Sequence, residues 1–346
     1  MREWIDCTLG DIVTFQRGHD LPKTQMQYGR YPVVGSNGII GYHNEYTTDE
    51  PSITIGRSGN VGKPFIYYGK TWSHNTTLYI KDFKGNDPVF VFYFLKTMDL
   101  ENYAGGSAVP TLNRNHIHTL PICVPGNLME QKKIGLLLKT IDDKIALNNA
   151  INCNLEQQAQ AIYQSMFIST HHETDRTGLL SELISVKYGK DHKKLNDGNY
   201  PVYGSGGIMR YVEKPIYEKE SVLIPRKGSL NNVMYVDEPF WSVDTMFYTE
   251  MKMPNVAKYV FHFVKSKDLA SLNAGSAVPS MTTDILNSME IRIPSAERLA
   301  EFEGLVAPLY KTIKDNIRQS DNLAALRDTL LPKLMNGEID VSEVEI

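Results

Sequence analysis

Tyr31-Pro-Val-Val-Gly-Ser36 returns 169 residues later as Tyr200-Pro-Val-Tyr-Gly-Ser205, and this repeated phrase decides how the chain is organised. Gly106-Ser-Ala-Val-Pro110 returns at the same offset as Gly275-Ser-Ala-Val-Pro279. Self-similarity at one fixed offset indicates that a single structural unit is used twice. Two copies of one unit suit a ligand with two separated half-sites better than they suit one small substrate.

Each copy reads as a mixed α/β domain. Short runs rich in β-branched and aromatic residues alternate with Gly, Pro, Asn and Asp, which is typical of strands joined by polar loops. The predicted strands are residues 53–56, 65–68 and 77–80 in the first copy and 222–224 and 233–236 in the second. Large apolar faces predict short helices at residues 88–96 and 256–265. The predicted fold class is therefore α/β, in the mixed (α+β) sense.

A long helix is predicted to begin after Pro125-Gly-Asn127. Asn127 with Glu130 three residues later is typical of a capped helix start, and residues 128–167 contain no Pro and one Gly. Apolar residues then follow at alternating spacings of four and three, as in the seam of a coiled coil. They are Ile134, Leu138, Ile141, Ile145, Leu155, Ala159, Ile162 and Met166. One helix over residues 128–167 would be ~60 Å long at 1.5 Å per residue.

The second copy carries a matching helix after residue 295. Its seam residues are Phe302, Val306, Leu309, Ile313, Asn316, Ser320, Leu323 and Leu330. Leu331-Pro332 predicts the end of this helix, and Gly304 and Pro308 predict a kink near its start. Two long helices of one chain are expected to pair with each other, most simply as an antiparallel coiled coil.

Three asparagines fall in the middle of these seams. A buried Asn in a coiled-coil seam costs stability but fixes the register, so Asn148, Asn152 and Asn316 are expected to set how the two helices align. The alternative leaves the asparagines in solvent and runs the seam through Leu137, Ile141, Ile151 and Leu155.

The composition limits the class of protein. A length of 346 residues predicts about two domains, and 42% hydrophobic residues suffice for buried cores. The formal charge of −4 at pH 7 argues against coating nucleic acid by bulk electrostatics, although it leaves room for local basic patches. Three dispersed cysteines indicate neither a disulfide framework nor a zinc site. No apolar run reaches the roughly 20 residues of a membrane helix, so a cytoplasmic protein without membrane contact is expected.

Several phrases together closely resemble the specificity subunits of type I restriction-modification systems. They are Pro125-Gly-Asn-Leu-Met-Glu-Gln-Lys-Lys-Ile134, Leu155-Glu-Gln-Gln-Ala-Gln-Ala-Ile-Tyr-Gln-Ser-Met-Phe167, the Gly-Ser-Ala-Val-Pro phrase with its repeat, and Leu326-Arg-Asp-Thr-Leu-Leu-Pro-Lys-Leu-Met-Asn-Gly-Glu338. Each phrase alone is weak evidence. The whole succession, which covers essentially the entire chain in the same order, is highly specific.

The resemblance implies a non-catalytic reader of double-stranded DNA. It implies two target recognition domains, residues 1–126 and 171–294, each reading one half of a bipartite site. It also implies two spacer helices, residues 127–170 and 295–335, and a tail at 336–346. Two methyltransferase subunits and a restriction and translocase subunit are the implied partners. S-adenosylmethionine, ATP and Mg²⁺ are expected only on those partners, with no cofactor and no metal in this chain.

The same resemblance assigns spacing and methyltransferase docking to residues of the two helices. These are Glu130, Gln131, Ile134, Ile141, Asn148, Leu155, Ile162, Phe302, Leu309, Ile313 and Leu330. At the 169 offset the Glu130-Gln131 pair faces Leu299-Ala300, which puts equal docking of two methyltransferase subunits in doubt.

Candidate DNA contacts lie on two pairs of loops, because groove reading requires polar side chains on loops that reach base edges. The first pair is residues 56–60 and 225–232, in which Arg57 aligns with Arg226. An arginine present in both copies is expected to contact phosphate. Neighbouring residues that differ between the copies, such as Ser58 and Lys227, are expected to discriminate between bases. The second pair is residues 73–76 and 242–245. The candidates are Arg57, Ser58, Asn60, His74, Asn75, Arg226, Lys227, Ser229, Asn231 and Asp244. The competing interpretation makes the arginines solvated turn cations, and Asn75 and Asp244 turn caps.

Two other functions remain as alternatives. A self-contained methyltransferase or nuclease is disfavoured because no Asn/Asp-Pro-Pro-Tyr phrase is present. The run Gly56-Arg-Ser-Gly-Asn-Val-Gly-Lys63 also has one residue too many for a nucleotide-binding P-loop. The pairs His116 with His118 and His171 with His172 lack further metal ligands at useful spacing and read as surface histidines. A coiled-coil assembly protein without DNA contact is the second alternative.

Overall fold

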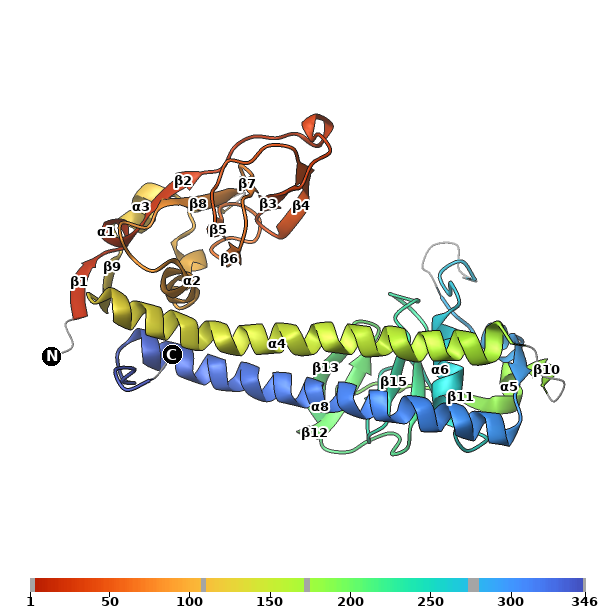
Figure 1. The fold of residues 1–346 in the computed structure, drawn as a ribbon. Coiled ribbons are helices and arrows are strands. Elements are labelled where there is room, and N and C mark those ends of the chain that lie inside the picture. The colour runs from red at the N-terminus through yellow and green to blue at the C-terminus, as the bar shows by residue number, and fades with distance from the viewer. Residues whose placement is uncertain (1–3, 107–109, 171–174, 273–279, 345–346) are drawn as a thin grey trace. The chain divides into compact units, whose positions relative to one another are not determined.

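The computed structural model describes residues 4–106, 110–170, 175–272 and 280–344. Their contacts divide the chain into two compact units. Unit 1 comprises Met1–Asn149 and Ile317–Ile346, and unit 2 comprises Ala150–Asn316. Each unit therefore holds one short-element domain together with one part of each long helix (Figure 1). Within the described residues, no helix is both long and apolar enough to cross a membrane.

Unit 1 is built from three small sheets. Its elements are β1 (Trp4–Thr8), α1 (Leu9–Ile12), β2 (Thr14–Arg17), η1 (Lys23–Gln25), β3 (Tyr31–Gly35), β4 (Gly38–His43), β5 (Ser52–Gly56), β6 (Pro64–Tyr67), β7 (Trp72–Ser73), β8 (Thr77–Asp82), α2 (Pro88–Lys96), η2 (Leu100–Tyr103), α3 (Arg114–His118), β9 (Pro121–Pro125) and the first part of α4 (Leu128–Tyr163). The strand orders are β2-β8-β5-β6, β4-β3-β7 and β1-β9. Strand β5, in the interior of its sheet, is buried along its whole length.

Unit 2 repeats this plan. Its elements are a π-helical turn (Gln164–Ile168), β10 (Arg176–Leu179), α5 (Leu180–Leu183), β11 (Ile184–Tyr188), β12 (Asp197–Gly204), β13 (Gly207–Val212), β14 (Ser221–Pro225), β15 (Met234–Val236), β16 (Trp241–Ser242), β17 (Met246–Met251), α6 (Ala257–Lys265), α7 (Thr283–Asn287), β18 (Glu290–Ile293) and part of α8 (Ala296–Met335). The strand orders β11-β17-β14-β15, β13-β12-β16 and β10-β18 match those of unit 1. The predicted internal repeat and the mixed α/β class are confirmed.

The short helices α2 and α6 dock on the long helices through one polar contact at equivalent positions. In unit 1 the Tyr93 hydroxyl donates to Asp142 at 2.7 Å. In unit 2 His262, 169 residues later, pairs with the Tyr310 hydroxyl at 3.0 Å. Burial, with a smaller contribution from Lys265, lowers the pKa of His262 to about 4, so the neutral ring occupies this contact.

The long helices α4 and α8 are antiparallel, as predicted. In unit 1 Asn148 donates to Ser320 at 3.2 Å, and in unit 2 Asn316 donates to Asn152 at 2.8 Å. Asn148 and Asn316 are 168 residues apart, and so are Asn152 and Ser320, so within the helices the repeat is one residue shorter and one polar pairing is used twice.

The seam contains the asparagines. Asn148 is fully buried and Asn152 is 8% exposed, whereas Ile151 is 37% exposed. The alternative seam through Ile151 with solvated asparagines is therefore wrong. Because a buried amide must find a partner, the Asn pairs specify which helical turns can face each other.

The prediction that Leu331-Pro332 ends the second helix is wrong. α8 continues as one helix through Gly304, Pro308 and Pro332 to Met335. The reason lies in unit 1, where Leu334 and Met335 are buried in the hydrophobic core together with Val341 of the tail. Burying such side chains stabilises by about 1.5–3 kcal/mol each, which offsets the roughly 3 kcal/mol that an interior proline costs. The first helix also ends slightly early, at Tyr163, before the π-helical turn.

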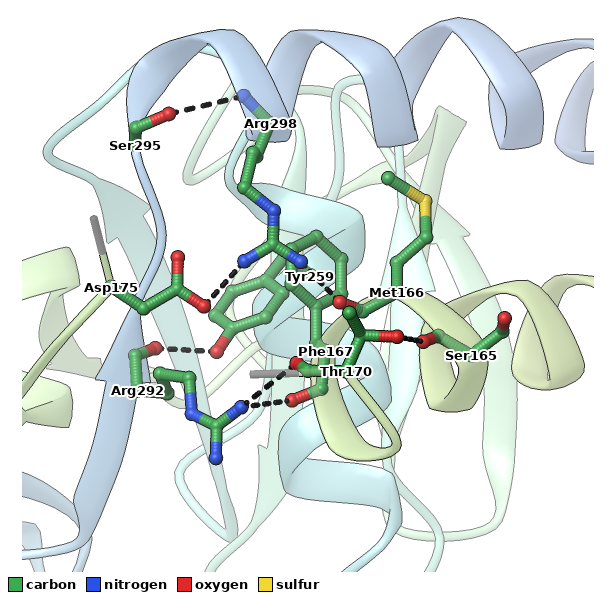
Figure 2. A network of polar contacts seen from close by, with 9 residues as sticks. All are labelled: Ser165, Met166, Phe167, Thr170, Asp175, Tyr259, Arg292, Ser295 and Arg298. Atoms are coloured by element: carbon green, nitrogen blue, oxygen red, sulfur yellow. Dashed lines mark hydrogen bonds and ion pairs between the residues drawn. The ribbon is translucent and has the colours of Figure 1, made fainter. Parts of the chain in front are cut away.

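A charged network holds the C-terminal end of α4 inside unit 2 (Figure 2). The last carbonyl groups of a helix have no partner within the helix and attract cations. Arg292 donates to the carbonyl oxygens of Phe167 at 2.9 Å and Thr170 at 3.3 Å. Arg298, in the first turn of α8, donates to the carbonyl oxygen of Met166 and forms an ion pair with Asp175. Arg298 thus joins the end of one long helix to the start of the other, and Arg292 joins the same end to strand β18.

Candidate nucleic-acid interface

In unit 1 the structure brings the two predicted loops together through backbone hydrogen bonds. The amides of Arg57 and Ser58 both donate to the carbonyl oxygen of Thr76, at 2.8 and 3.2 Å. The carbonyl oxygen of Arg57 accepts from Leu112 at 2.9 Å, which adds the segment after α2 and η2 to the cluster. The loop after β5 is therefore held on both sides by backbone contacts.

Unit 2 repeats these bonds almost atom for atom. The amides of Arg226 and Lys227 donate to the carbonyl oxygen of Thr245 at 2.8 and 3.2 Å, and Arg226 accepts from Met281 at 2.9 Å. Backbone bonds do not depend on side-chain identity, so this frame can carry different side chains in the two copies. The repeated Gly-Ser-Ala-Val-Pro phrase lies largely outside the described residues.

A third loop, which the sequence analysis did not assign to the site, joins each cluster. It follows β2 in unit 1 and β11 in unit 2. His19 donates its amide proton to Ser73 at 2.8 Å, and Lys190 donates to Ser242 at 2.8 Å. The preceding glycines make this approach possible, since a Cβ on Gly18 would lie 2.1 Å from the His74 carbonyl oxygen and one on Gly189 would lie 2.0 Å from that of Val243. The repeated glycine was a signal that could have revealed this loop.

The paired arginines have matching geometry. The Arg57 guanidinium donates to the carbonyl oxygen of Asn75 at 3.4 Å, and the Arg226 guanidinium donates to that of Asp244 at 3.3 Å. Both arginines are partly exposed. Each guanidinium is thus anchored at one nitrogen and leaves other N–H groups for a ligand, which fits an anion such as phosphate.

The side chains around the arginines differ between the copies. Ser58 is replaced by Lys227, Asn60 by Ser229 and Asn75 by Asp244. Of these, Lys227, Ser229 and Asp244 are exposed in unit 2, while Ser58, Asn60 and Asn75 are partly exposed in unit 1. His74 pairs with the Thr76 hydroxyl at 3.2 Å. One backbone frame therefore presents two different sets of hydrogen-bonding groups.

Asn231 has a structural role in unit 2. Its amide nitrogen donates to Asp268 at 3.0 Å, and its oxygen accepts from the backbone amide of Ala270 at 3.0 Å. Both ends of this side chain are thereby engaged inside the protein. These contacts within the protein explain an asparagine at position 231 without any contact to DNA.

The helix residues predicted to dock partners divide by burial. The buried ones are Gln131, Ile134, Ile141, Asn148, Phe302 and Ile313. The partly exposed ones are Glu130, Leu155, Ile162, Leu309 and Leu330. Gln131 uses its amide to join α4 to Asn86 at 2.8 Å and to the Pro125 carbonyl oxygen at 2.9 Å. The buried side chains hold the helices and domains together and have little surface for a partner. On the part of α4 that belongs to unit 1, Leu136 and Leu147 are exposed at a spacing of 11, which keeps them on one side of the helix.

Replacing either paired arginine with alanine tests the interface. We expect Arg57→Ala or Arg226→Ala to weaken DNA binding uniformly across sequences, because each removes a contact to phosphate, and to reduce its dependence on salt. Titration at several salt concentrations measures both effects. Assembly with partner subunits should be unchanged in size-exclusion chromatography. Loss of assembly with intact DNA binding would place the arginines at a protein interface instead.

Among the described residues no cluster of His, Cys, Asp and Glu could hold a metal ion. The two units thus hold two copies of one loop cluster, with matched arginines and different side chains at the loop tips.

The comparisons identify that protein class. The family model of the type I restriction modification DNA specificity domain matches residues 1–157 and 179–303. A Mycoplasma pneumoniae protein that carries the name of a type I specificity subunit is 24% identical, over 96% of each chain. The specificity subunit of the type I restriction enzyme MjaIX from Methanocaldococcus jannaschii is 24% identical, covering 74% of this chain and 70% of that one. The crystal structure of an S subunit from M. genitalium has the same fold, with a TM-score of 0.71 and 19% identity over 99% of this chain and 97% of that one.

The chain belongs to the family of type I restriction-modification DNA specificity proteins. It is a non-catalytic, DNA sequence-recognition subunit that acts within a complex of other subunits.

Proposed function

We propose that each unit reads one half of a bipartite DNA site through its own loop cluster. Residues 1–126 and 171–294 are the two target recognition domains in this proposal. The supporting observation is the repeated backbone frame. It holds Arg57 and Arg226 in the same way, while the side chains around the two arginines differ between the units. A shared arginine suits the phosphate backbone, which is the same in any sequence, and the variable groups suit base edges, which differ.

The polar side chains supply the chemistry for two different readings. Asp244 is exposed and accepts hydrogen bonds only, which suits the N4 amino group of cytosine. Asn75 at the equivalent position carries an amide, which suits adenine. Ser58, Asn60 and His74 in unit 1 and Lys227 and Ser229 in unit 2 complete the proposed contacts.

The long helices fix the separation of the two half-sites in this proposal. Their polar pairs, Asn148 with Ser320 and Asn316 with Asn152, hold one register, and a fixed register gives a fixed half-site spacing. We propose two methyltransferase subunits and a restriction and translocase subunit as partners. The exposed face of Leu136 and Leu147 in unit 1 is a surface on which a methyltransferase subunit can bury apolar area.

A domain exchange tests the proposal directly. Residues 9–125 are replaced by the matching segment of another family member, and the methylated sequence is then read by methylation-sensitive sequencing. We expect one half of the recognised site to change while the other half and the spacing are kept. A change in both halves would contradict modular reading. If the sequence recognised by the complex stayed the same after exchange of either domain, the result would support the alternative of an assembly protein without DNA contact.

A further inference from the structure

At the end of β2, beside the loop cluster of unit 1, lies an arginine whose equivalent position in unit 2 carries no cation. Arg17 ends β2, and the equivalent residue at the end of β11 is Tyr188. The glycines that follow are equivalent by their contacts as well as by sequence, because Gly18 donates to Thr77 and Gly189 donates to Met246, each at 3.0 Å. Arg17 and Tyr188 therefore occupy equivalent positions in the two units.

In unit 1 the side chains of this loop form a polar chain. Arg17 lies 3.9 Å from the Asp20 carboxylate, and the side-chain amide of Asn75 donates to the same carboxylate oxygen. The backbone carbonyl oxygen of Asn75 in turn accepts from the Arg57 guanidinium. Arg17 and Asp20 remain about half and three-quarters exposed, so both can still meet a ligand.

Unit 2 makes a different arrangement with the same backbone. The Arg226 guanidinium lies 5.4 Å from the centre of the Tyr188 ring, and Tyr188 also packs edge-on against Phe247 at 5.0 Å. Asp191, which is equivalent to Asp20, accepts from the backbone amide of Lys193 at 3.0 Å. No described contact links Asp191 to Asp244, so the polar chain of unit 1 has no counterpart among the contacts described for unit 2.

The Asp20 carboxylate influences which ligand groups Arg17 can bind. Next to Asp20 the pair is close to neutral, so it gains little from a phosphate group, unlike Arg57, which is held by a carbonyl oxygen. A base edge offers directional acceptors instead. Guanine presents O6 and N7 side by side in the major groove, and an arginine guanidinium matches both. A carboxylate behind the guanidinium limits its rotation and favours that geometry.

Building on the proposed function, we infer that Arg17 determines the specificity of unit 1 by contacting a guanine, and that Asp20 is a positioning residue for Arg17. Because Tyr188 replaces Arg17 in unit 2, the half-site read by unit 2 lacks this contact. The two halves of the recognised site then differ at the corresponding base pair.

The test measures base preference position by position. The complex with its partner subunits is titrated with a set of duplexes in which each base of the site is varied in turn. We expect Arg17→Ala to reduce the preference for guanine at one position of one half-site by about 5- to 150-fold, with preferences elsewhere kept within about twofold. Asp20→Asn should reduce the preference at the same position by a smaller factor. Arg30→Ala, which removes another exposed arginine of unit 1, should change no base preference.

Three results would contradict these expectations, and each leads to a different conclusion. A uniform loss of affinity for all duplexes in Arg17→Ala would make Arg17 a phosphate contact and overturn the inference, while the proposed function would stand. An effect of Asp20→Asn at a different position would overturn the positioning role. If neither Arg17→Ala nor the exchange of residues 9–125 altered any base preference, the proposed function itself would fail.

Discussion

Replacing Arg298 with alanine is expected to destabilise unit 2 by about 3–5 kcal/mol, because it leaves a buried carboxylate without its cation. The Arg298 and Asp175 side chains are 11% and 3% exposed. The substitution also removes the donor to the Met166 carbonyl oxygen at the end of α4 and the guanidinium that lies 5.0 Å from the centre of the Phe167 ring (Figure 2). Hydrogen exchange followed by mass spectrometry measures the loss of stability. The amides of β17 report the free energy of opening of unit 2, and those of the equivalent strand β8 report that of unit 1.

A matched ion pair in the same unit provides the control. Arg210 contacts Asp197 at 2.8 Å, but Asp197 is 94% exposed, so Arg210→Ala should cost at most about 1 kcal/mol. The order of the two effects is the critical observation. Equal, small effects of Arg298→Ala and Arg210→Ala would show that the network at the helix junction does not stabilise unit 2.

Adding one methyl group to Gly18 or to Gly189 is expected to abolish reading by one unit and to spare the other. The new Cβ of Gly18→Ala would lie 2.1 Å from the His74 carbonyl oxygen, and that of Gly189→Ala would lie 2.0 Å from the Val243 carbonyl oxygen. Both contacts are with backbone, so the third loop must move away from the cluster and lose its hydrogen bond.

Scrambled half-sites give the measurement. The wild-type complex should bind less tightly when either half of its site is scrambled. The Gly18→Ala complex should become indifferent to scrambling of one half, and the Gly189→Ala complex to scrambling of the other. Gly69→Ala is the control, since nothing lies within 4 Å of its added Cβ, and it should respond as the wild type does. Indifference to the same half in both glycine variants would refute the assignment of one half to each unit.

Local patterns were sufficient to predict much of the fold. The five predicted strands and the helices α2 and α6 follow from short-range apolar patterning, and the α4 seam follows from its four-three spacing. Both depend on residues close in sequence. The end of α8 could not be predicted in this way, because Leu334 and Met335 are held by the unit 1 core, which is assembled mostly from residues more than 200 positions earlier.

The candidate site was predicted in part. Arg57 and Arg226, with their two loops, were found because their repeat is visible in the sequence. The loop of Arg17 and Tyr188 was missed because its place in the cluster depends on strand pairing, β2 with β8 and β11 with β17. Gln131 was predicted to dock a partner, yet the fold buries it at the start of α4, where it bonds to Asn86 and Pro125.

The sequence by itself determined that one unit is used twice and that two long helices carry Asn in their seams, because repeats and helical periodicity are properties of the order of residues. Tertiary structure alone decided which side chains meet. Arg298 reaches Asp175 across 123 positions, and Asn75 reaches Asp20 across 55. Such contacts depend on how strands and helices pack, and packing brings together residues whose separation along the chain carries no local signal.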